Sequence, residues 1–258
     1  MLKKLYVISA FVVVVFSMIV AFKTLQSVQT RVPQQDEQVL GEKSEISGQM
    51  ETEKYKLSWF YAEPENLSLI PNFSENKTSG KIVEENSCKF AANGSFYQGE
   101  IGEYKPIGLF VANSEIINPY RTNNLFNGIL SINQFDTPRI TTSLPKDPLI
   151  TAIQTGPVIL ENDNFMSYSK SNDKNARRMI AMVTGENKLI FMTIYDKSSS
   201  FNGPKLSELK DIVKEFEESQ KINVADAINL DGGSASAFYS ENLSLKEISP
   251  VGSLFCLK

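Results

Sequence analysis

An acidic side chain stands between an apolar segment and two adjacent glycines in the last part of the chain. The sequence Asn-Leu-Asp-Gly-Gly-Ser occupies 229–234 and follows 225–228, a predicted buried strand. Adjacent glycines are typical of positions where φ must be positive or where a ligand approaches the backbone closely. The carboxylate of Asp231 and the hydroxyl of Ser234 could form a reaction site there. An ordinary turn is the alternative, because Asp-Gly is a common turn sequence.

The composition limits the chemistry open to Asp231. The 258 residues include no histidine, which excludes Ser-His-Asp and Cys-His catalysis and argues against a catalytic zinc site. Acid–base catalysis must therefore use Asp, Glu, Lys, Tyr or Cys. The 26 basic and 30 acidic side chains are mixed along the chain and give a net charge of −4, so no nucleic-acid partner is expected.

Three further segments place polar groups beside glycine or at the start of a predicted strand. Individually they have ordinary interpretations as a hairpin turn, a strand bend and a solvated basic pair. Taken together with the Asp231 bend they form a possible site. The residues concerned are Asn93, Gly94, Gln154, Gly156, Arg177 and Arg178.

Most of the elements that must position these residues are predicted strands. One helix is predicted after Gly203-Pro204, because a single apolar stripe repeats from Leu206 to Phe216. Many strands with few helices predict an α+β fold, a single mixed-sheet domain with one or two packed helices. The predicted strands lie at 55–61, 108–117, 128–135, 188–195 and 251–257.

The amino-terminal segment predicts a membrane anchor over 1–23. An apolar run at 5–22 follows Lys3-Lys4, and eighteen helical residues span roughly 27 Å, close to the thickness of the hydrocarbon core. A cleaved signal peptide and a buried core helix are the alternatives, but no convincing cleavage site follows the run. The lysines favour a cytoplasmic amino terminus and a single-pass plasma-membrane protein with an extracytoplasmic domain.

The stretch 24–53 is predicted to be a flexible tether. It is polar and contains no aromatic residue, so it cannot bury enough surface to become ordered. As a coil its ends would lie roughly 30 Å apart. The folded domain is therefore expected at 54–258.

The chain has two cysteines, Cys88 and Cys256. An outward-facing domain would permit a disulfide between them. Spacing alone does not show whether their segments are adjacent, and two separate buried thiols are slightly favoured. Neither cysteine has a partner base nearby in sequence, so a catalytic thiol is not expected.

The order of these motifs resembles that of the phosphodiester glycosidase family, over about residues 88–239. Met179 stands where the family usually has Thr or Ser, and Ser95 and Ser234 replace glycines, which predicts slightly less room for a ligand at those turns. The similar segments are Asn-Gly-Ser-Phe-Tyr at 93–97, Gln-Thr-Gly-Pro at 154–157, Arg-Met-Ile at 178–180, Gly-Pro-Lys-Leu-Ser-Glu-Leu at 203–209 and Asn-Leu-Asp-Gly-Gly at 229–233.

The resemblance implies a substrate whose sugar is joined through its anomeric carbon to a phosphodiester. Arg178 would bind phosphate oxygens, and Asp231 would attack the anomeric carbon, activate water or stabilise an oxocarbenium-like centre. The remaining candidates would contact the phosphate, through Arg177 and a backbone nest at the glycines, or the sugar, through the two side-chain amides. These candidates are Asn93, Gly94, Gln154, Gly156, Arg177, Gly232, Gly233 and Ser234.

Glycosidases usually pair two carboxylates, and a partner for Asp231 is not evident from the motifs. Asp163, Asp173 and Asp226 are possible, and Asp196, at the end of a predicted strand, is preferred over them. No cofactor or metal is expected, with a divalent cation such as calcium at Asp231 as the alternative.

Two functions follow from the sequence. The first is a membrane-anchored hydrolase or transferase for sugar phosphodiesters, with a cell-wall polymer or exopolysaccharide as the expected source. The second is a non-catalytic module that binds anionic glycans on the same fold. An acid beside a bound anion favours the enzyme, because a carboxylate weakens anion binding unless it takes part in chemistry.

Overall fold

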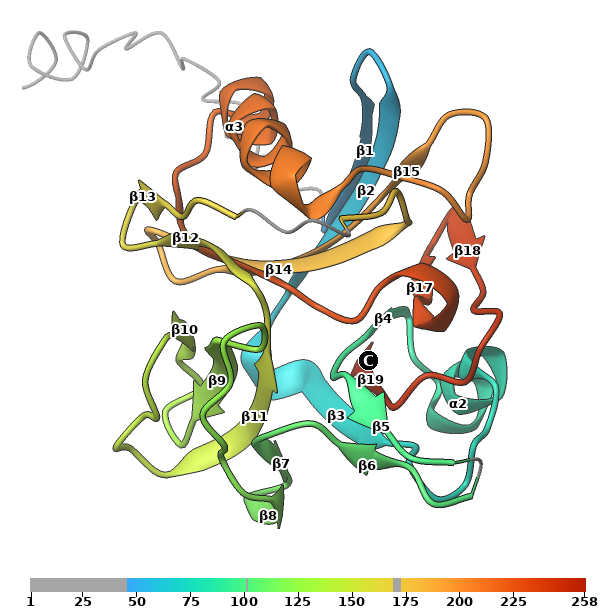
Figure 1. Cartoon of the computed structure of the whole chain (residues 1–258), viewed down its shortest axis with the longest axis vertical. Coiled ribbons are helices and arrows are strands. Elements are labelled where there is room, and N and C mark those ends of the chain that lie inside the picture. The colour runs from blue at the N-terminus through green and yellow to red at the C-terminus, as the bar shows by residue number, and fades with distance from the viewer. Residues whose placement is uncertain (1–45, 101, 169–172) are drawn as a thin grey trace, which may run out of the picture. The chain divides into compact units, whose positions relative to one another are not determined.

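Antiparallel strands dominate the structure, and most of them pair with strands that are distant in the sequence (Figure 1). The computed structural model describes residues 46–100, 102–168 and 173–258. The strands of this part form three larger sheets and one pair of short strands, β5 (Tyr97–Gln98) and β6 (Lys105–Pro106). The predicted sheet-dominated α+β domain with few helices is confirmed.

The largest sheet has seven strands and carries most of the predicted site. Helix α3 (Leu209–Gln220) covers one of its faces (Figure 1). In spatial order the strands are β1 (Ser47–Glu51), β2 (Tyr55–Ala62), β15 (Leu189–Asp196), β14 (Arg178–Thr184), β16 (Val224–Asn229), β12 (Val158–Glu161) and β13 (Asn164–Phe165).

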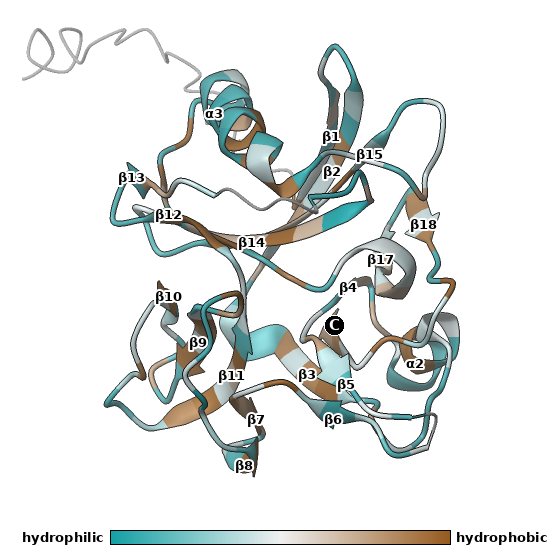
Figure 2. Cartoon of the chain, viewed as in Figure 1, coloured by the Kyte–Doolittle hydropathy of each residue, from teal (hydrophilic) through white to brown (hydrophobic). Residues whose placement is uncertain are grey.

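Helix α3 confirms the predicted apolar stripe. Leu209, Val213 and Phe216 are buried against the seven-stranded sheet, and the Phe216 ring lies 5.0 Å from that of Trp59. The α-helix begins at Leu209, later than the Gly203-Pro204 signal indicated, because a 3-10 turn at 206–208 precedes it. Its polar outer face is visible in Figure 2.

The two other large sheets have five strands each. The strand predicted at 108–117 is divided in two, because Asn113 and Ser114 adopt positive φ and form a turn. One sheet consists of β10 (Pro138–Thr141), β9 (Gly128–Asn133), β11 (Leu149–Thr155), β7 (Phe110–Ala112) and β8 (Glu115–Asn118). The other consists of β18 (Leu243–Leu245), β17 (Phe238–Ser240), β4 (Phe90–Asn93), β19 (Ser253–Leu257) and β3 (Leu67–Pro71).

One cluster of buried side chains draws on all three large sheets, with Phe191 from β15, Phe255 from β19 and Phe110 from β7. The ring of Phe191 lies 5.5 Å from Phe60 and 4.7 Å from Phe255, and all three side chains are fully buried. Burial of such rings supplies most of the apolar area that drives folding. Figure 2 shows hydrophobic residues concentrated on the strands, including β3, β9 and β14.

A second α-helix, α2 (Ser79–Asn86), was not identified from the sequence. It is only eight residues long, and of its apolar residues only Ile82 is fully buried, so it lacks a recognisable stripe. Thr78 caps it by accepting a hydrogen bond from the amide of Lys81. Such a cap is preferred at helix starts but is too common to predict a helix by itself.

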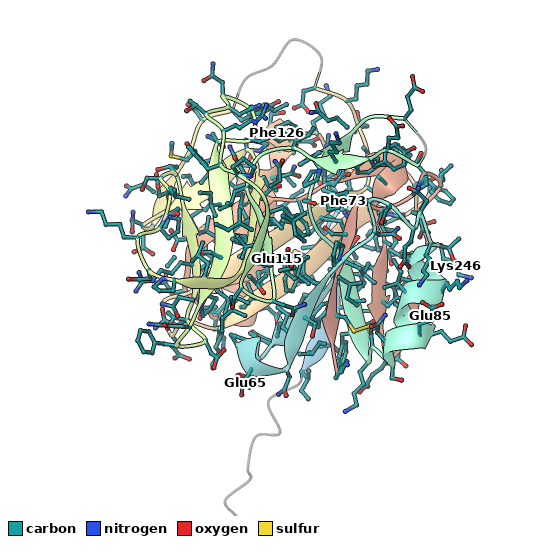
Figure 3. All side chains as sticks on the ribbon, turned by 90° about the horizontal axis from the view of Figure 1, so that it is seen from below. Glu65, Phe73, Glu85, Glu115, Phe126 and Lys246 are labelled. Carbon is teal, nitrogen blue, oxygen red and sulfur yellow. A yellow bond between two sulfur atoms is a disulfide. The ribbon has the colours of Figure 1, made fainter. Side chains whose placement is uncertain are left out.

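Cys88 and Cys256 form a disulfide, so the slightly favoured interpretation as two separate thiols is wrong. Their Cα atoms lie 5.3 Å apart although 168 positions separate them in sequence. The cause is that β4, which follows Cys88, pairs with β19, which contains Cys256. The bond is the yellow link near Glu85 in Figure 3.

The folded domain begins earlier than the predicted boundary at 54. Strand β1, at 47–51, pairs with β2 along its whole length, so the last part of the predicted 24–53 tether belongs to the domain. Backbone hydrogen bonds and the close approach of Gly48 to the Trp59 ring hold this polar edge strand. Polar composition therefore indicated a tether where the chain forms an edge strand.

The predicted anchor at 1–23 and the tether up to residue 45 lie outside the described residues. Within the described ranges, none of the helices has the length and apolar character needed to cross a membrane.

Candidate active site

The site forms where several strand ends meet. Strand β14 begins at Arg178 and runs antiparallel to β16, which ends at Asn229, so the start of one and the end of the other lie at the same edge of the sheet. Ile180 is the partner of Asn229 in this pairing. The chain then continues to Asp231, which places this acid close to the entrance of β14. Antiparallel register thus brings together two motifs that are 53 positions apart in the sequence.

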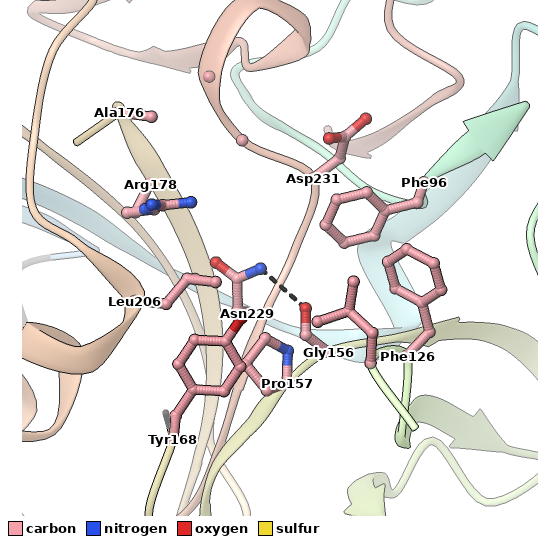
Figure 4. A pocket seen from close by; sticks show the side chains of 13 residues that line it. Phe96, Phe126, Gly156, Pro157, Tyr168, Ala176, Arg178, Leu206, Asn229 and Asp231 are labelled. Carbon is pink, nitrogen blue, oxygen red and sulfur yellow. Dashed lines mark hydrogen bonds between the residues drawn. The ribbon is translucent and has the colours of Figure 1, made fainter. Parts of the chain in front are cut away.

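A pocket of about 190 Å³ lies at this edge (Figure 4). Both Arg178 and Asp231 line it, as the sequence predicted. The volume is below the roughly 300–1,000 Å³ typical of drug-sized ligands, so the pocket suits one compact group and not a long polymer segment. The lining residues are Phe96, Leu125, Phe126, Gly156, Pro157, Tyr168, Ala176, Arg178, Leu206, Asn229, Asp231, Gly232 and Gly233.

Asp231 is a buried acid with a strongly shifted pKa. Only 9% of the residue is exposed, and burial raises the pKa of its carboxyl from 3.8 to about 8, against the opposing effect of a hydrogen bond from the Gly232 amide. The residue is held through its backbone, because its amide donates to the Gly94 carbonyl at 3.1 Å and its carbonyl accepts from the Asn93 side chain at 2.7 Å. A carboxyl that exchanges its proton near neutral pH is suited to acid–base or nucleophilic chemistry.

Arg178 is fixed at the other side of the pocket. Its Nε donates to the Pro204 carbonyl at 2.9 Å, and one Nη2 hydrogen bond goes to the Lys174 carbonyl. Asp173 lies 3.6 Å from the same Nη2. These contacts hold the plane of the guanidinium, while Nη1 makes no hydrogen bond to the described residues. That nitrogen remains able to donate to an anionic ligand.

Arg177 has a structural position, contrary to its predicted role in binding substrate. It is 1% exposed, and its side chain points away from the pocket into a set of protein acceptors. Its guanidinium donates to the Ser236 hydroxyl and to the carbonyls of Ser200, Ser236 and Lys246. Arg178 begins β14 and lines the pocket, whereas Arg177, the residue before the strand, does not.

Replacing Arg177 by methionine is expected to destabilise the domain by about 3 kcal/mol, because it leaves several buried carbonyl groups without a donor. Chemical denaturation measures this loss. Arg139→Met is the matched control: Arg139 is 55% exposed and its pairing with Asp147 is a surface ion pair, so the change should stay within about 0.5 kcal/mol. Equal effects of the two substitutions would contradict the structural role of Arg177.

The side-chain amides of Asn93 and Gln154 are also structural, and the predicted sugar contacts are wrong for both. Asn93 is 1% exposed; it donates to the Asp231 carbonyl and accepts from the Ala237 amide. Gln154 is equally buried and donates to the carbonyls of Arg121 and Phe126. The two residues position the Asp231 segment and the loop before β9. Neither lines the pocket.

The glycine-rich bend is partly as predicted. Gly232 lines the pocket, and a Cβ there would lie 2.9 Å from the Arg177 carbonyl. Gly233 also lines it and has a φ of +64°, which favours glycine, but its amide donates to the Arg177 carbonyl at 2.8 Å. The predicted anion-binding nest therefore lacks one of its donors. Ser234 is exposed and does not line the pocket.

The remaining predicted glycines have different positions. Gly156 lines the pocket and precedes a cis peptide bond to Pro157. Gly94 lies outside the lining and packs against Ser253, and its carbonyl accepts from the Asp231 amide. Strand β4 ends at Asn93 and pairs with β17 and β19, while β5, the next strand along the chain, pairs with β6, so the alternative of a hairpin turn at this pair is also wrong.

Several lining residues were missed by the sequence reasoning. Asn229 has a polar side chain at the last position of a buried strand, which could have indicated a site. The rings of Phe96 and Phe126 pack at 4.6 Å and form an apolar wall of the pocket (Figure 4). Phe126 belongs to no recognised motif, so only the fold brings it to the site.

Asp173 is the carboxylate beside Arg178, whereas the preferred second acid, Asp196, is not in the pocket. Burial alone would raise the pKa of Asp173, but the amides of Ser207 and Leu206, the Ser207 hydroxyl and Arg178 together lower it. It stays ionised and serves as a hydrogen-bond acceptor for the start of the 206–208 turn. Asp196 instead accepts hydrogen bonds from Ser198 in an exposed loop.

The other two acids lie away from the pocket. Asp163 accepts a hydrogen bond from Asn223, and Asp226 accepts one from the Asn162 amide, and neither is among the lining residues. Within the described ranges, no three Asp, Glu, Cys or His side chains gather closely enough to hold a metal ion.

Comparisons with known proteins show the family and the fold of the chain. The family model of the phosphodiester glycosidases matches residues 86–255, whereas no curated protein matches the chain in sequence. The catalytic domain of zebrafish N-acetylglucosamine-1-phosphodiester alpha-N-acetylglucosaminidase, solved in a form auto-inhibited by its pro-peptide, superposes with a TM-score of 0.61 at 13% identity, covering 83% of this chain and 84% of that one.

Two bacterial structures are similar as well. A hypothetical protein from Synechocystis has a TM-score of 0.56 at 11% identity, covering 81% of this chain and 61% of its own. A protein from Burkholderia pseudomallei, described as a candidate exported protein, has a TM-score of 0.56 at 9% identity, covering 79% and 74%. At these identities the likeness shows a shared fold.

Proposed function

Because the chain belongs to the phosphodiester glycosidase family, we propose that it hydrolyses or transfers glycosyl groups joined through the anomeric carbon to a phosphodiester. One observation carries the proposal: a buried acid with a pKa of about 8, Asp231, lines the same small pocket as the oriented guanidinium of Arg178. The positive guanidinium can stabilise the phosphate end of the scissile bond, and the carboxylate, when ionised, can act at the anomeric carbon.

The reaction breaks the bond between the anomeric carbon and the bridging oxygen, and the electron pair leaves with the phosphate. Nη1 of Arg178 would donate to the phosphate oxygens and stabilise the charge of the departing monoester. Ionised Asp231 would remove a proton from an attacking water, which supplies the new oxygen on the sugar, or would itself attack the anomeric carbon and form a glycosyl ester that water or an acceptor hydroxyl then cleaves to regenerate the carboxylate. A phosphate leaving group needs little protonation, so a single well-placed carboxylate suffices for this step.

A binding module for anionic glycans is the second candidate. It would use Arg178 and the glycine-rich bend but would gain nothing from Asp231. Burying a carboxyl costs stability unless the group is paired, and within the described residues Asp231 forms no ion pair. The retention of such a costly group beside an anion site favours the enzyme.

An assay for released sugar separates the two candidates. UDP-N-acetylglucosamine and simple glycosyl phosphodiesters are incubated with the purified domain, and free sugar is measured over time. The enzyme is supported by release that saturates with substrate. Binding without release, shown by calorimetry on the same compounds, would support the module.

The activity is expected to rise with pH. Since Asp231 acts in its ionised form and its pKa is about 8, kcat/KM should increase by about tenfold per pH unit below that value and level off above it. The measurement is kcat/KM between pH 5.5 and 9.5, with Asp196→Asn, an exposed acid outside the pocket, giving the same profile. A profile that falls over this range would mean that the protonated acid is the active form.

We also propose that the domain works outside the cytoplasm, held by the apolar run at 5–22. The disulfide supports an oxidising compartment. The substrate would then be a cell-wall polymer or exopolysaccharide. The test is fractionation of cells that express the full chain: extraction from membranes by alkaline carbonate, or inaccessibility to added protease in intact spheroplasts, would contradict this location.

A further inference from the structure

The pocket contains a buried acceptor that the described part of the protein leaves without a partner. This atom is Oδ1 of Asn229, a residue that is 2% exposed and lines the pocket. Buried side-chain oxygens in folded proteins nearly always accept a hydrogen bond, and leaving one without a donor costs about 1–3 kcal/mol. An unpaired oxygen at this position therefore points to a donor that arrives with a ligand.

The orientation of the Asn229 amide is determined by its neighbours. Nδ2 donates to the Gly156 carbonyl at 2.9 Å (Figure 4). The reverse orientation would bring two acceptor oxygens together, so Oδ1 must be the atom that remains. The backbone is held too, because the Asn229 amide donates to the Pro157 carbonyl at 3.0 Å and its carbonyl accepts from the Thr155 hydroxyl at 2.8 Å. The acceptor is thus rigidly placed before any ligand binds.

A fixed acceptor distinguishes the two ends of the proposed substrate. A phosphodiester group has only acceptor oxygens and would be repelled by Oδ1, whereas a sugar offers hydroxyl or amide donors. The opposite preference holds at Arg178, which has only donors. The wall formed by Phe96 and Phe126 is suited to the C–H groups of the sugar ring or to an acyl methyl.

From these contacts we infer that Asn229 is the residue that selects the glycosyl group, with Oδ1 accepting a hydrogen bond from one hydroxyl or N-acyl amide of the sugar. The phosphate lies toward Arg178 and the glycine-rich bend, so the substrate has one orientation in the pocket. The inference rests on the proposed function for its substrate class. It concerns recognition and assigns no chemical step to Asn229.

Glycosyl methyl phosphodiesters serve as probes, in a series in which one hydroxyl or acetamido group at a time is replaced by hydrogen. The wild-type protein should lose about tenfold to a hundredfold in kcat/KM for one member of the series. In Asn229→Leu, kcat/KM for the intact probe should be lower than in the wild type by a similar factor. For the analogue that lacks the sensitive group, kcat/KM should be the same in the variant and the wild type. Whether the sensitive group is a hydroxyl or an amide identifies the donor.

Further variants serve as controls. Asn229→Ala also lacks the acceptor and replaces the leucine variant if that one does not fold. Asn229→Asp, protonated on the oxygen that faces the Gly156 carbonyl, keeps an acceptor oxygen and should still prefer the intact probe. Thr193→Val removes another buried oxygen that has no partner in the described part of the chain, on β15 outside the pocket, and should leave the preference unchanged.

Three outcomes would overturn the inference: a wild-type protein indifferent to every deletion, a leucine variant that discriminates as strongly as the wild type, or a folded aspartate variant that has lost the preference. Failure of the proposed function is distinguishable, because it appears as no turnover of any probe. In that case calorimetry measures the dissociation constant of each probe for the wild type and the variants, and the preference is the ratio between the intact probe and each analogue. An Asn229-dependent preference in binding supports the inference without catalysis, and its absence overturns both.

Discussion

Asp231→Asn is expected to lower kcat for a glycosyl phosphodiester by at least about a thousandfold, because the amide can neither attack the anomeric carbon nor take a proton from water. The replacement is nearly isosteric, and the backbone contacts to Gly94 and Asn93 do not involve the side chain. The architecture of the pocket should therefore persist. Rates with saturating substrate measure the effect.

The same substitution should make the protein more stable at alkaline pH. Below pH 3.8 the carboxyl is protonated in both the folded and the unfolded chain and costs nothing. Between 3.8 and about 8 the unfolded chain ionises while the folded one retains its proton, so wild-type stability falls as pH rises. Asparagine does not ionise. We expect a gain of about 2 kcal/mol at pH 8, or roughly 5 °C in Tm, and little difference at pH 4.

The control for both effects is Asp196→Asn. This acid undergoes the same chemical replacement outside the pocket, and between pH 4 and pH 8 neither kcat nor the pH dependence of Tm should change appreciably. Full turnover by Asp231→Asn would remove the catalytic role of Asp231. Loss of turnover together with loss of stability at pH 8 would indicate a structural role instead.

Removal of the disulfide by Cys88→Ala/Cys256→Ala should lower the free energy of unfolding by about 3–4 kcal/mol and Tm by about 10 °C. The bond closes a loop across 168 positions, and a long loop restricts the unfolded chain strongly. Thermal unfolding with and without reductant measures the effect.

Reduction of the wild type should reproduce the loss, while the double variant should be insensitive to reductant. Turnover at 25 °C should remain, because neither cysteine lines the pocket. A double variant with the Tm of the oxidised wild type would show that the bond contributes nothing to stability.

The sequence predicted the fold where local pattern and tertiary structure agree. The alternation and apolar runs of β2, β9, β15 and β16 and the stripe of α3 are all present. Arg178 and Asp231 were identified because their types suit the chemistry and their motifs follow the family order. The two residues line the same pocket because β14 pairs with β16.

Roles that depend on side-chain direction could not be predicted. Arg177 and Arg178 are adjacent and chemically identical, yet one is surrounded by carbonyl oxygens and the other faces the pocket. Asn93 and Gln154 looked like sugar-binding amides, but their hydrogen-bonding capacity is used by the backbone. Asn229 is the converse case, since its Nδ2 donates to Gly156 while its oxygen has no hydrogen-bond partner among the described residues.

The position of β19 has a consequence for how the protein acquires its fold. This strand, at 253–257, lies between β3 and β4, so β3 is not joined to the rest of that sheet until almost the last described residues have been synthesised. Strand β4 leads to Gly94, whose amide is bonded to Ser253 and whose carbonyl holds Asp231. The reaction centre thus cannot assemble until residues 253–257 have been synthesised and released from the ribosome, and premature termination near residue 250 should yield an inert, aggregation-prone product.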